Sequence, residues 1–152
     1  GDDGENLLQS AANNGLGVIA FSPLAQGLLT DKYLDGIPEG SRASQGKSLS
    51  EGMLNVDNID MVRKLNDIAQ ERGQSLAQMA LAWVLREQGE YGADTVTSAL
   101  IGASSVEQLD NSLDSLNNLE FSDAELEAID EISHDAGINI WAKATDSKTR
   151  EN

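Results

Sequence analysis

The amino-acid sequence predicts an α/β fold in which parallel strands are joined by helical crossovers. Two short apolar runs, at residues 17–21 and 96–101, have the composition of buried strands. Segments with apolar residues at helical spacing lie before, between and after these runs. The predicted order is therefore helix, strand, loop, helix, helix, strand, helix, helix, and such an alternation favours parallel strands.

The first predicted helix spans residues 6–14, where leucines and alanines recur at helical spacing and Gly15 provides a stop. The strand at 17–21 follows after a short turn, and its continuous apolar run is typical of a strand covered on both faces. Pro23 cannot donate a backbone hydrogen bond, so the strand must end near it. Gly27 in the next turn allows an unusual backbone dihedral or a close approach.

Residues 25–57 are predicted to form a long loop with a helical turn at about 28–33. A loop of this length is typically functional or mobile. It carries three of the ten basic residues, Lys32, Arg42 and Lys47, in an otherwise acidic chain. This local excess favours an anionic ligand; the alternative is that all three are ordinary solvated surface charges.

The two helices between the strands are predicted at residues 58–72 and 76–87. The first is amphipathic and ends at Gly73, whereas the second is apolar nearly all round and should be largely buried. Met79 and Trp83 in the second helix are interpreted as core side chains rather than as a cofactor site. A polar loop then leads to the strand at 96–101.

Three Ser-x-x-Gln or Ser-x-x-Glu patterns predict helix N-termini, because in such a capping box the two side chains bond each other's backbone N–H groups. They lie at residues 75–78, 105–108 and 122–125. The chain from residue 138 is predicted to be irregular, and Trp141 within it should dock on another surface. The apolar residues predicted to line the last two helices are Val106, Leu109, Leu113 and Leu116, and then Leu126, Ile129 and Ile132.

Small and polar side chains follow both predicted strands at the point where each strand ends. Residues 22–27 follow the first strand, and residues 102–105 join the second strand to a helix. The carboxyl ends of neighbouring parallel strands lie at the same edge, so these two segments should lie close together. A helix N-terminus offers free backbone N–H groups and the positive end of a dipole, which suit a phosphate. Together with the basic loop, this predicts a phosphorylated ligand that spans the two strand ends.

Composition and charge exclude several classes of function. The chain has 152 residues, with 26 acidic and 10 basic side chains and a formal net charge of −16, a field that repels nucleic acid. There is no cysteine, which excludes disulfides and thiolate chemistry. His134 is the only histidine, so a histidine-rich metal site or a Ser-His-Asp triad has no support. Neither a membrane span nor a signal-peptide pattern is found, so we expect a soluble, cytoplasmic protein.

Several motifs, in order along the chain, resemble the aldo-keto reductase family. Within that family the chain looks nearest to the bacterial glyceraldehyde-phosphate reductases and the potassium-channel beta subunits. The likeness covers about residues 5–140. The motifs are AFSPLAQGLLTDKY at 20–33, GIP at 36–38, Ser-Arg at 41–42, GQSLAQMALAW at 73–83, LIGAS at 100–104 and EQL at 107–109.

The resemblance implies a (β/α)₈ barrel that binds NADP(H) at the C-terminal ends of its strands, with residues 17–24 as the seventh strand and 96–101 as the eighth. Phe21 would then stack on the nicotinamide. The remaining cofactor-binding positions follow from the same resemblance. They are Ser22, Pro23, Leu24, Gln26 and Gly27 at the pyrophosphate, Lys32 and Arg42 on the adenosine phosphate side, and Gly102, Ser104 and Gln108 at the 2′-phosphate and adenine.

The chain departs from the family pattern in two ways. Asn111 and Ser112 stand where this group has Glu-Asn facing the adenine, which weakens the expectation of adenine contacts and of a preference for NADP over NAD. The length accounts for only two of eight strands, so residues 1–152 are expected to be a single partial domain with an irregular tail at 141–152. The family's catalytic Asp, Tyr, Lys and His have no counterpart here, because Tyr33 and His134 do not correspond to them.

The leading hypothesis is therefore the C-terminal, NADP-binding portion of an NADPH-dependent aldo-keto reductase that reduces small carbonyl compounds. Residue 1 is glycine rather than methionine, which indicates a processed start or part of a longer chain. Two strands cannot close a barrel, so self-association or pairing with the remainder of a barrel is expected, without nucleic acid or membrane partners. The alternatives are a non-catalytic nucleotide-binding or interaction module and an inactive fragment.

Overall fold

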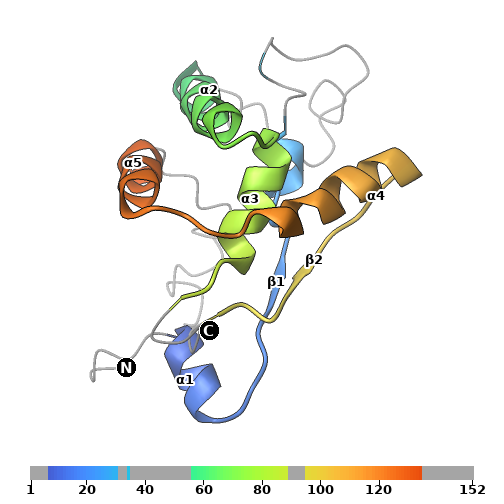
Figure 1. Cartoon of the computed structure of the whole chain (residues 1–152), viewed down its shortest axis with the longest axis vertical. Helices are drawn as coiled ribbons and strands as arrows, with labels where there is room; N and C mark the ends of the chain where they lie inside the picture. The colour runs from blue at the N-terminus through green and yellow to red at the C-terminus, as the bar shows by residue number, and fades with distance from the viewer. Residues whose placement is uncertain (1–6, 31–33, 35–55, 89–94, 135–152) are drawn as a thin grey trace, which may run out of the picture.

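The structure is a computed structural model that describes residues 7–30, 34, 56–88 and 95–134 (Figure 1). The order of helices and strands in these residues confirms the predicted order, with two short 3₁₀ turns added. The elements are α1 (Leu7–Asn13), β1 (Ile19–Phe21), η1 (Ala25–Gly27), α2 (Val56–Glu71), α3 (Leu76–Leu85), β2 (Ser98–Leu100), α4 (Val106–Leu113), η5 (Asp114–Asn117) and α5 (Asp123–His134).

The two strands pair in parallel, as the alternation of elements predicts. Ile19 lies opposite Ser98 and Phe21 lies opposite Leu100, so both strands end at the same level. The chain between them crosses over through α2 and α3. Just before β1 the Thr97 side chain lies close to Gly17, since a Cβ on Gly17 would be 3.1 Å from the Thr97 hydroxyl oxygen.

The prediction that both strand faces are covered is wrong for the described residues. Ile19 is 68% exposed, Phe21 61% and Leu100 64%, and alternation places the first two on one face of the pair. The central residues, Ala20 and Ala99, point the other way and are half-buried. On the β2 side that covered face meets α3. A helical layer therefore covers one face only, and the strands are shorter than the ranges 17–24 and 96–101.

Helix ends follow the predicted signals, with small shifts. α2 ends before Gly73, whose φ of 70° is the left-handed conformation that favours glycine at a helix C-terminus. α3 opens with a full capping box, in which Ser75 N–H donates to Gln78 at 2.8 Å and Gln78 N–H donates to the Ser75 hydroxyl at 3.2 Å. α3 ends at Leu85 rather than residue 87. η1 forms just before the helical turn predicted at about 28–33; the chain turns at 28–30, and residues 31–33 lie outside the described residues.

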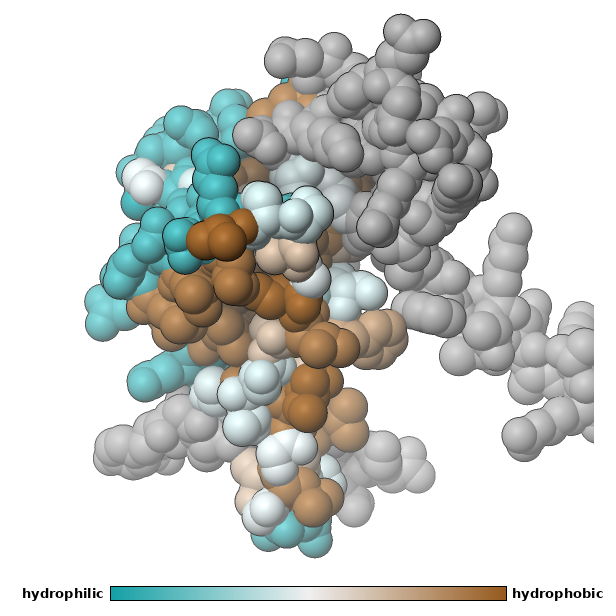
Figure 2. Space-filling model, turned by 90° about the vertical axis from the view of Figure 1, so that its right-hand side faces the viewer, coloured by the Kyte–Doolittle hydropathy of each residue, from teal (hydrophilic) through white to brown (hydrophobic). Residues whose placement is uncertain are grey.

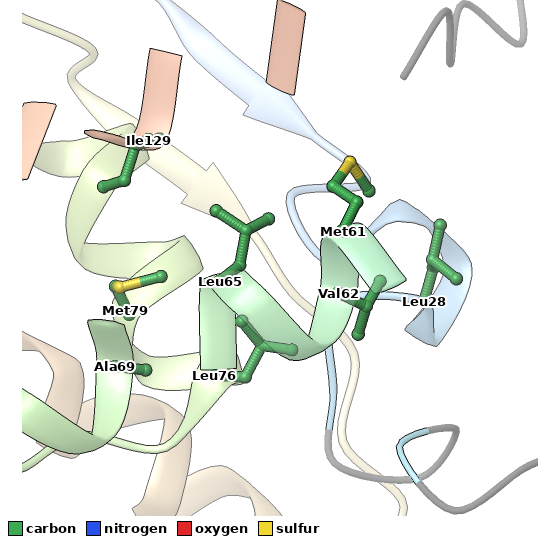
Figure 3. Packing of buried hydrophobic residues seen from close by; sticks show 8 residues of the cluster. All are labelled: Leu28, Met61, Val62, Leu65, Ala69, Leu76, Met79 and Ile129. Carbon is green, nitrogen blue, oxygen red and sulfur yellow. The ribbon is translucent and has the colours of Figure 1, made fainter. Parts of the chain in front are cut away.

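The hydrophobic core lies between α2, α3 and α5 rather than over the strands (Figure 3). It also takes in Leu28, which follows η1 and is 1% exposed. The predicted core role of Met79 and Trp83 is confirmed, since Met79 is buried in this cluster and Trp83 packs against it. The buried members of the cluster are Leu28, Met61, Val62, Leu65, Ala69, Leu76, Met79 and Ile129.

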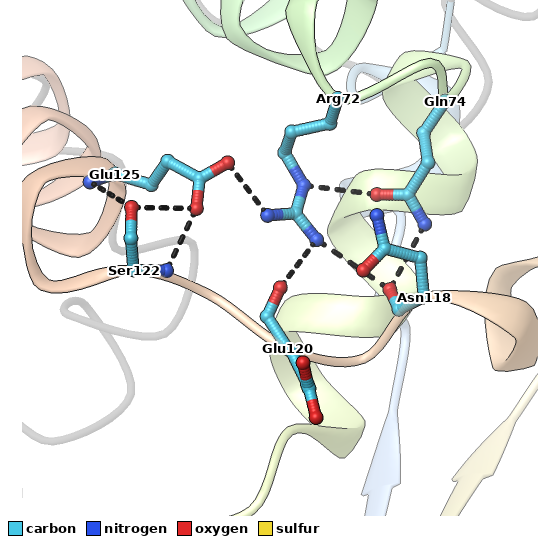
Figure 4. Close-up of polar contacts among 6 residues, drawn as sticks. All are labelled: Arg72, Gln74, Asn118, Glu120, Ser122 and Glu125. Carbon is cyan, nitrogen blue, oxygen red and sulfur yellow. Dashed lines mark hydrogen bonds and ion pairs between the residues drawn. The ribbon is translucent and has the colours of Figure 1, made fainter.

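Arg72, immediately after α2, ties this helix to the start of α5 (Figure 4). Its side chain is 3% exposed and pairs with Glu125 at 2.8 Å. It also donates to the side-chain oxygen of Gln74 at 3.0 Å and to the carbonyl oxygen of Glu120 at 2.9 Å. The guanidinium lies 3.7 Å from the ring centroid of Phe121. One buried cation therefore holds three separate segments together.

Glu125 completes the third predicted capping box, at the start of α5. Its carboxylate accepts from the Ser122 N–H at 2.7 Å and the Ser122 hydroxyl at 2.8 Å. Burial raises the pKa of Glu125, but the hydrogen bonds from Ser122 and Arg72 outweigh it and hold the pKa below its ordinary value. The carboxylate is therefore stabilised in its charged form in the folded protein.

Candidate functional site

The parallel register brings together the two segments that the sequence singles out. β1 ends at Phe21 and β2 at Leu100, and these residues are paired. The turn at 22–27 and the segment 101–105 that leads to α4 therefore start at the same edge of the strand pair. This confirms the predicted proximity of the two strand ends.

The turn after β1 contains left-handed backbone conformations at residues other than glycine. Ser22 has a φ of 54° and Ala25 a φ of 46°, while Gly27 has a φ of 98°. A left-handed non-glycine residue costs on the order of 1 kcal/mol or more, and such residues cluster at functional sites. From the sequence, an unusual dihedral was expected at Gly27 only. Neither Ser22 nor Ala25 carries a sequence signal for it.

Hydrogen bonds and packing fix the turn in this shape. Ala25 N–H donates to the Ser22 carbonyl oxygen at 3.0 Å, and Gly27 N–H donates to that of Leu24 at 2.8 Å. Leu28, the next residue, is buried in the core against α2. The turn is thus anchored to the core by the side chain that follows it.

The start of α4 differs in one bond from the predicted capping box. Ser105 is the N-cap, and its hydroxyl accepts from Gln108 N–H at 3.1 Å. The Gln108 side chain does not return to Ser105 N–H. It accepts instead from the N–H of Ser104 at 2.7 Å and from the Ser104 hydroxyl at 3.0 Å. Both Ser104 donors are therefore engaged within the chain.

The first turn of α4 still offers backbone donors. Among the described residues, no partner is found for the N–H groups of Val106 and Glu107, and both residues are exposed. These groups lie at the positive end of the helix dipole, where an anion is favoured. Gly102 lies just before them, and a Cβ at that position would meet nothing within 4 Å. The space before the helix is open to an anionic group.

The two positions that depart from the family pattern are both engaged by the chain itself. Asn111 accepts from the Gln78 amide through its side-chain oxygen at 3.0 Å and its carbonyl oxygen at 3.1 Å. Ser112 is 7% exposed and donates to the Gln108 carbonyl oxygen at 2.9 Å. The link between Gln78 and Asn111 was not anticipated, because the sequence assigned Gln78 to a capping box alone.

Some of the predicted site lies outside the described residues. Lys32 and Arg42 are among these, as is Trp141, so the structure does not test their proposed roles. Pro23, Leu24 and Gly27 are half-buried in the turn, whereas Phe21, Ser22, Gly102 and Ser104 are exposed. Gln26 lies in η1, and His134 is the last residue of α5, as its predicted place at a helix end requires.

The part of the chain that the structure describes contains neither a membrane-spanning helix nor a metal cluster. No helix there is long and apolar enough to cross a membrane. The same residues contain no group of three His, Cys, Asp or Glu side chains placed to hold a metal ion.

Comparison with known proteins identifies the family. Residues 2–134 match the model of the aldo/keto reductase family, and the chain belongs to that family. It is 49% identical over 148 residues to L-glyceraldehyde 3-phosphate reductase of Escherichia coli K12, a match that covers 95% of this chain. It is also 37% identical over 144 residues to a protein of Schizosaccharomyces pombe assigned as a voltage-gated potassium channel subunit beta. The chain spans 41% of the length of the first relative and 39% of the second.

Proposed function

We propose that this chain is the NADP(H)-binding, C-terminal part of a (β/α)₈ barrel, and that the whole protein reduces aldehydes or ketones. One observation carries the proposal: in the register of β1 and β2, the turn at 22–27 and the segment leading to α4 start at the same edge of the strand pair. Membership of an oxidoreductase family supports hydride transfer as the chemistry. The bound cofactor would supply the hydride, and residues outside this chain would supply the proton.

The residues at the shared edge fit a dinucleotide. Phe21 is 61% exposed at the end of β1 and could pack on a nicotinamide ring. The turn after it is held in a fixed shape, which lowers the entropy lost when a ligand binds. At the start of α4, the N–H groups of Val106 and Glu107 have no partner among the described residues, and together with the positive helix end they suit a phosphate. Ser104 would have to exchange its bonds to Gln108 for bonds to the ligand.

A non-catalytic role is the second candidate, and the exposed apolar surface favours it. Hydrophobic surface gathers over the middle of the face seen from the side on which α4 lies (Figure 2). Such a surface marks an interface with another chain or with the rest of a barrel. The second candidate is thus a module that assembles in response to a nucleotide without turning it over. The exposed large side chains include Ile19, Phe21, Leu100, Val106, Leu109, Leu113 and Leu116.

Titration of the purified chain with NADPH, followed by calorimetry and light scattering, tests the proposal. We expect saturable binding of one NADPH per chain, tighter than NADH, and no oxidation of NADPH when glyceraldehyde is added. Binding accompanied by a rise in mass would favour the assembly module over a barrel part awaiting completion. Absence of binding to either nucleotide at millimolar concentration would overturn both candidates and leave an inactive fragment.

A further inference from the structure

α4 carries the proposed phosphate-binding end and packs against α3, but its large apolar side chains are not buried there. Its large side chains face outward, since Val106 is 75% exposed, Leu109 40% and Leu113 50%. Ser112 is the buried residue of this helix. Its side chain is small, and its hydroxyl donates to the Gln108 carbonyl oxygen within α4. Apolar burial therefore does little to set the position of α4.

A polar bridge from α3 to α4 holds α4 in position instead. The Gln78 amide donates to both the carbonyl and the side-chain oxygen of Asn111, at 3.1 and 3.0 Å. The other end of the same amide accepts from Ser75 N–H at 2.8 Å, in the capping box of α3. All three residues are half-buried. One side chain thus couples the fixed N-terminus of α3 to the second half of α4.

We propose that Gln78 is a positioning residue that sets where the first turn of α4 lies. It thereby sets the affinity of the chain for the 2′-phosphate group of NADPH. This inference rests on the proposed function. α4 has eight residues and is about 12 Å long. Because so short a helix moves as a rigid body, a rotation of α4 at Asn111 also moves its first turn. Gln108, one turn before Asn111 and Ser112, holds Ser104 through its side chain.

The alternative is that Gln78 only caps α3. The variant Gln78→Glu separates the two roles. A Glu at this position keeps an acceptor for Ser75 N–H, since Ser-x-x-Glu is itself a capping box. It loses both donors and places a carboxylate against two oxygen atoms of Asn111. Gln78→Met, which removes the whole polar group at similar volume, is the second variant.

Gln74→Glu is a matched control with the same change of charge and the same loss of an amide donor. Gln74 lies just before α3 and accepts from the Arg72 side chain at 3.0 Å, a bond that Glu retains. The lost bond would be the one from its amide to the Asn118 carbonyl oxygen at 3.1 Å, after η5 and away from the start of α4. A general effect of added charge would appear in both variants.

The experiment combines amide hydrogen exchange of the free chain with the Kd values of NADPH and NADH. For Gln78→Glu we expect faster exchange at residues 104–113 with α2 and α5 unchanged, and a Kd for NADPH raised about fivefold or more, the loss expected from one or two hydrogen bonds. The Kd for NADH should rise less than about twofold. The ratio of the NADPH Kd to the NADH Kd should therefore rise in Gln78→Glu, and it should stay unchanged in Gln74→Glu.

Unchanged exchange in α4 of both Gln78 variants would overturn the inference, whatever the nucleotide results. Equal weakening of NADPH binding and NADH binding would also overturn the inference, because a general loss of structure in the variant would have that effect. Failure of the wild-type chain to bind nucleotide would refute the proposed function instead. The exchange data would then still show whether Gln78 positions α4.

Discussion

Replacement of Arg72 by methionine should lower the free energy of unfolding by about 2–4 kcal/mol, one of the two largest effects expected for a single side chain here. The side chain is 3% exposed, and its removal leaves the acceptors on Gln74 and Glu120 without their donor. Glu125 is 30% exposed, so water can solvate its carboxylate in the variant. The loss of stability is therefore smaller than for a fully buried ion pair. Urea unfolding followed by circular dichroism measures the change.

Lys64→Met on α2 is the matched control, because it removes a cation from the helix that Arg72 directly follows. Its ion pair with Asp60 is exposed, at 60% and 58%, so its loss should cost under about 0.5 kcal/mol. Arg72→Lys should recover less than half of the stability, since an ammonium group cannot reproduce the guanidinium geometry. Equal losses for Arg72→Met and Lys64→Met would refute the role given to Arg72.

The same network predicts a dependence on pH. The pKa of Glu125 is lower in the folded chain than its ordinary value of 4.5, so folding favours the ionised form. Its contribution is fully present above pH 4.5 and is lost as the pH falls through the lowered pKa of the folded state. The stability difference between wild type and Glu125→Gln should therefore shrink on acidification through this range. A difference that stays constant or grows would contradict the assignment.

Replacement of Leu28 by alanine should cost about 3 kcal/mol and also weaken nucleotide binding. Leu28 is 1% exposed in the core cluster, where removal of a large aliphatic side chain leaves a cavity. It also directly follows the turn at 22–27, so its loss frees the proposed pyrophosphate-binding segment. Leu7→Ala, at a position 79% exposed, should change the stability by less than about 0.5 kcal/mol.

Two measurements separate the effects of the Leu28 change. Urea unfolding gives the stability, and NADPH titration far below the transition, where the variant is still folded, gives the affinity. We expect a weaker affinity even under these folding conditions, because the turn has lost its anchor. Native affinity in the folded variant would show that the turn is fixed by its own hydrogen bonds instead.

Local signals in the sequence predicted much of the fold. The capping boxes at residues 75–78 and 122–125 formed as expected, because both partners lie within one turn. The distant partners of Gln78 and Glu125 bond other atoms of these side chains. The box at Ser105 was half wrong, since the Gln108 side chain found two donors on Ser104. The parallel pairing followed from the alternation of strands and helices.

Burial could not be read from the same patterns. A run such as Val18 to Phe21 is typical of a strand covered on both faces, but coverage depends on what packs around it, and the described chain has two strands. The left-handed conformations of Ser22 and Ala25 also have no local signal, since they are imposed by the turn and its packing. The Gln78–Asn111 bridge joins residues far apart in sequence, and only the packing of α3 on α4 reveals it.

Amide hydrogen exchange of the chain with and without saturating NADPH tests the central claim most directly. If the nucleotide lies across the shared edge of the strand pair, exchange should slow in both segments, residues 22–30 and 101–108, while α5 is unaffected. Protection of both segments in one experiment would place the ligand at the junction that the register creates. Protection confined to α5 or α2, or no protection at saturation, would contradict the account.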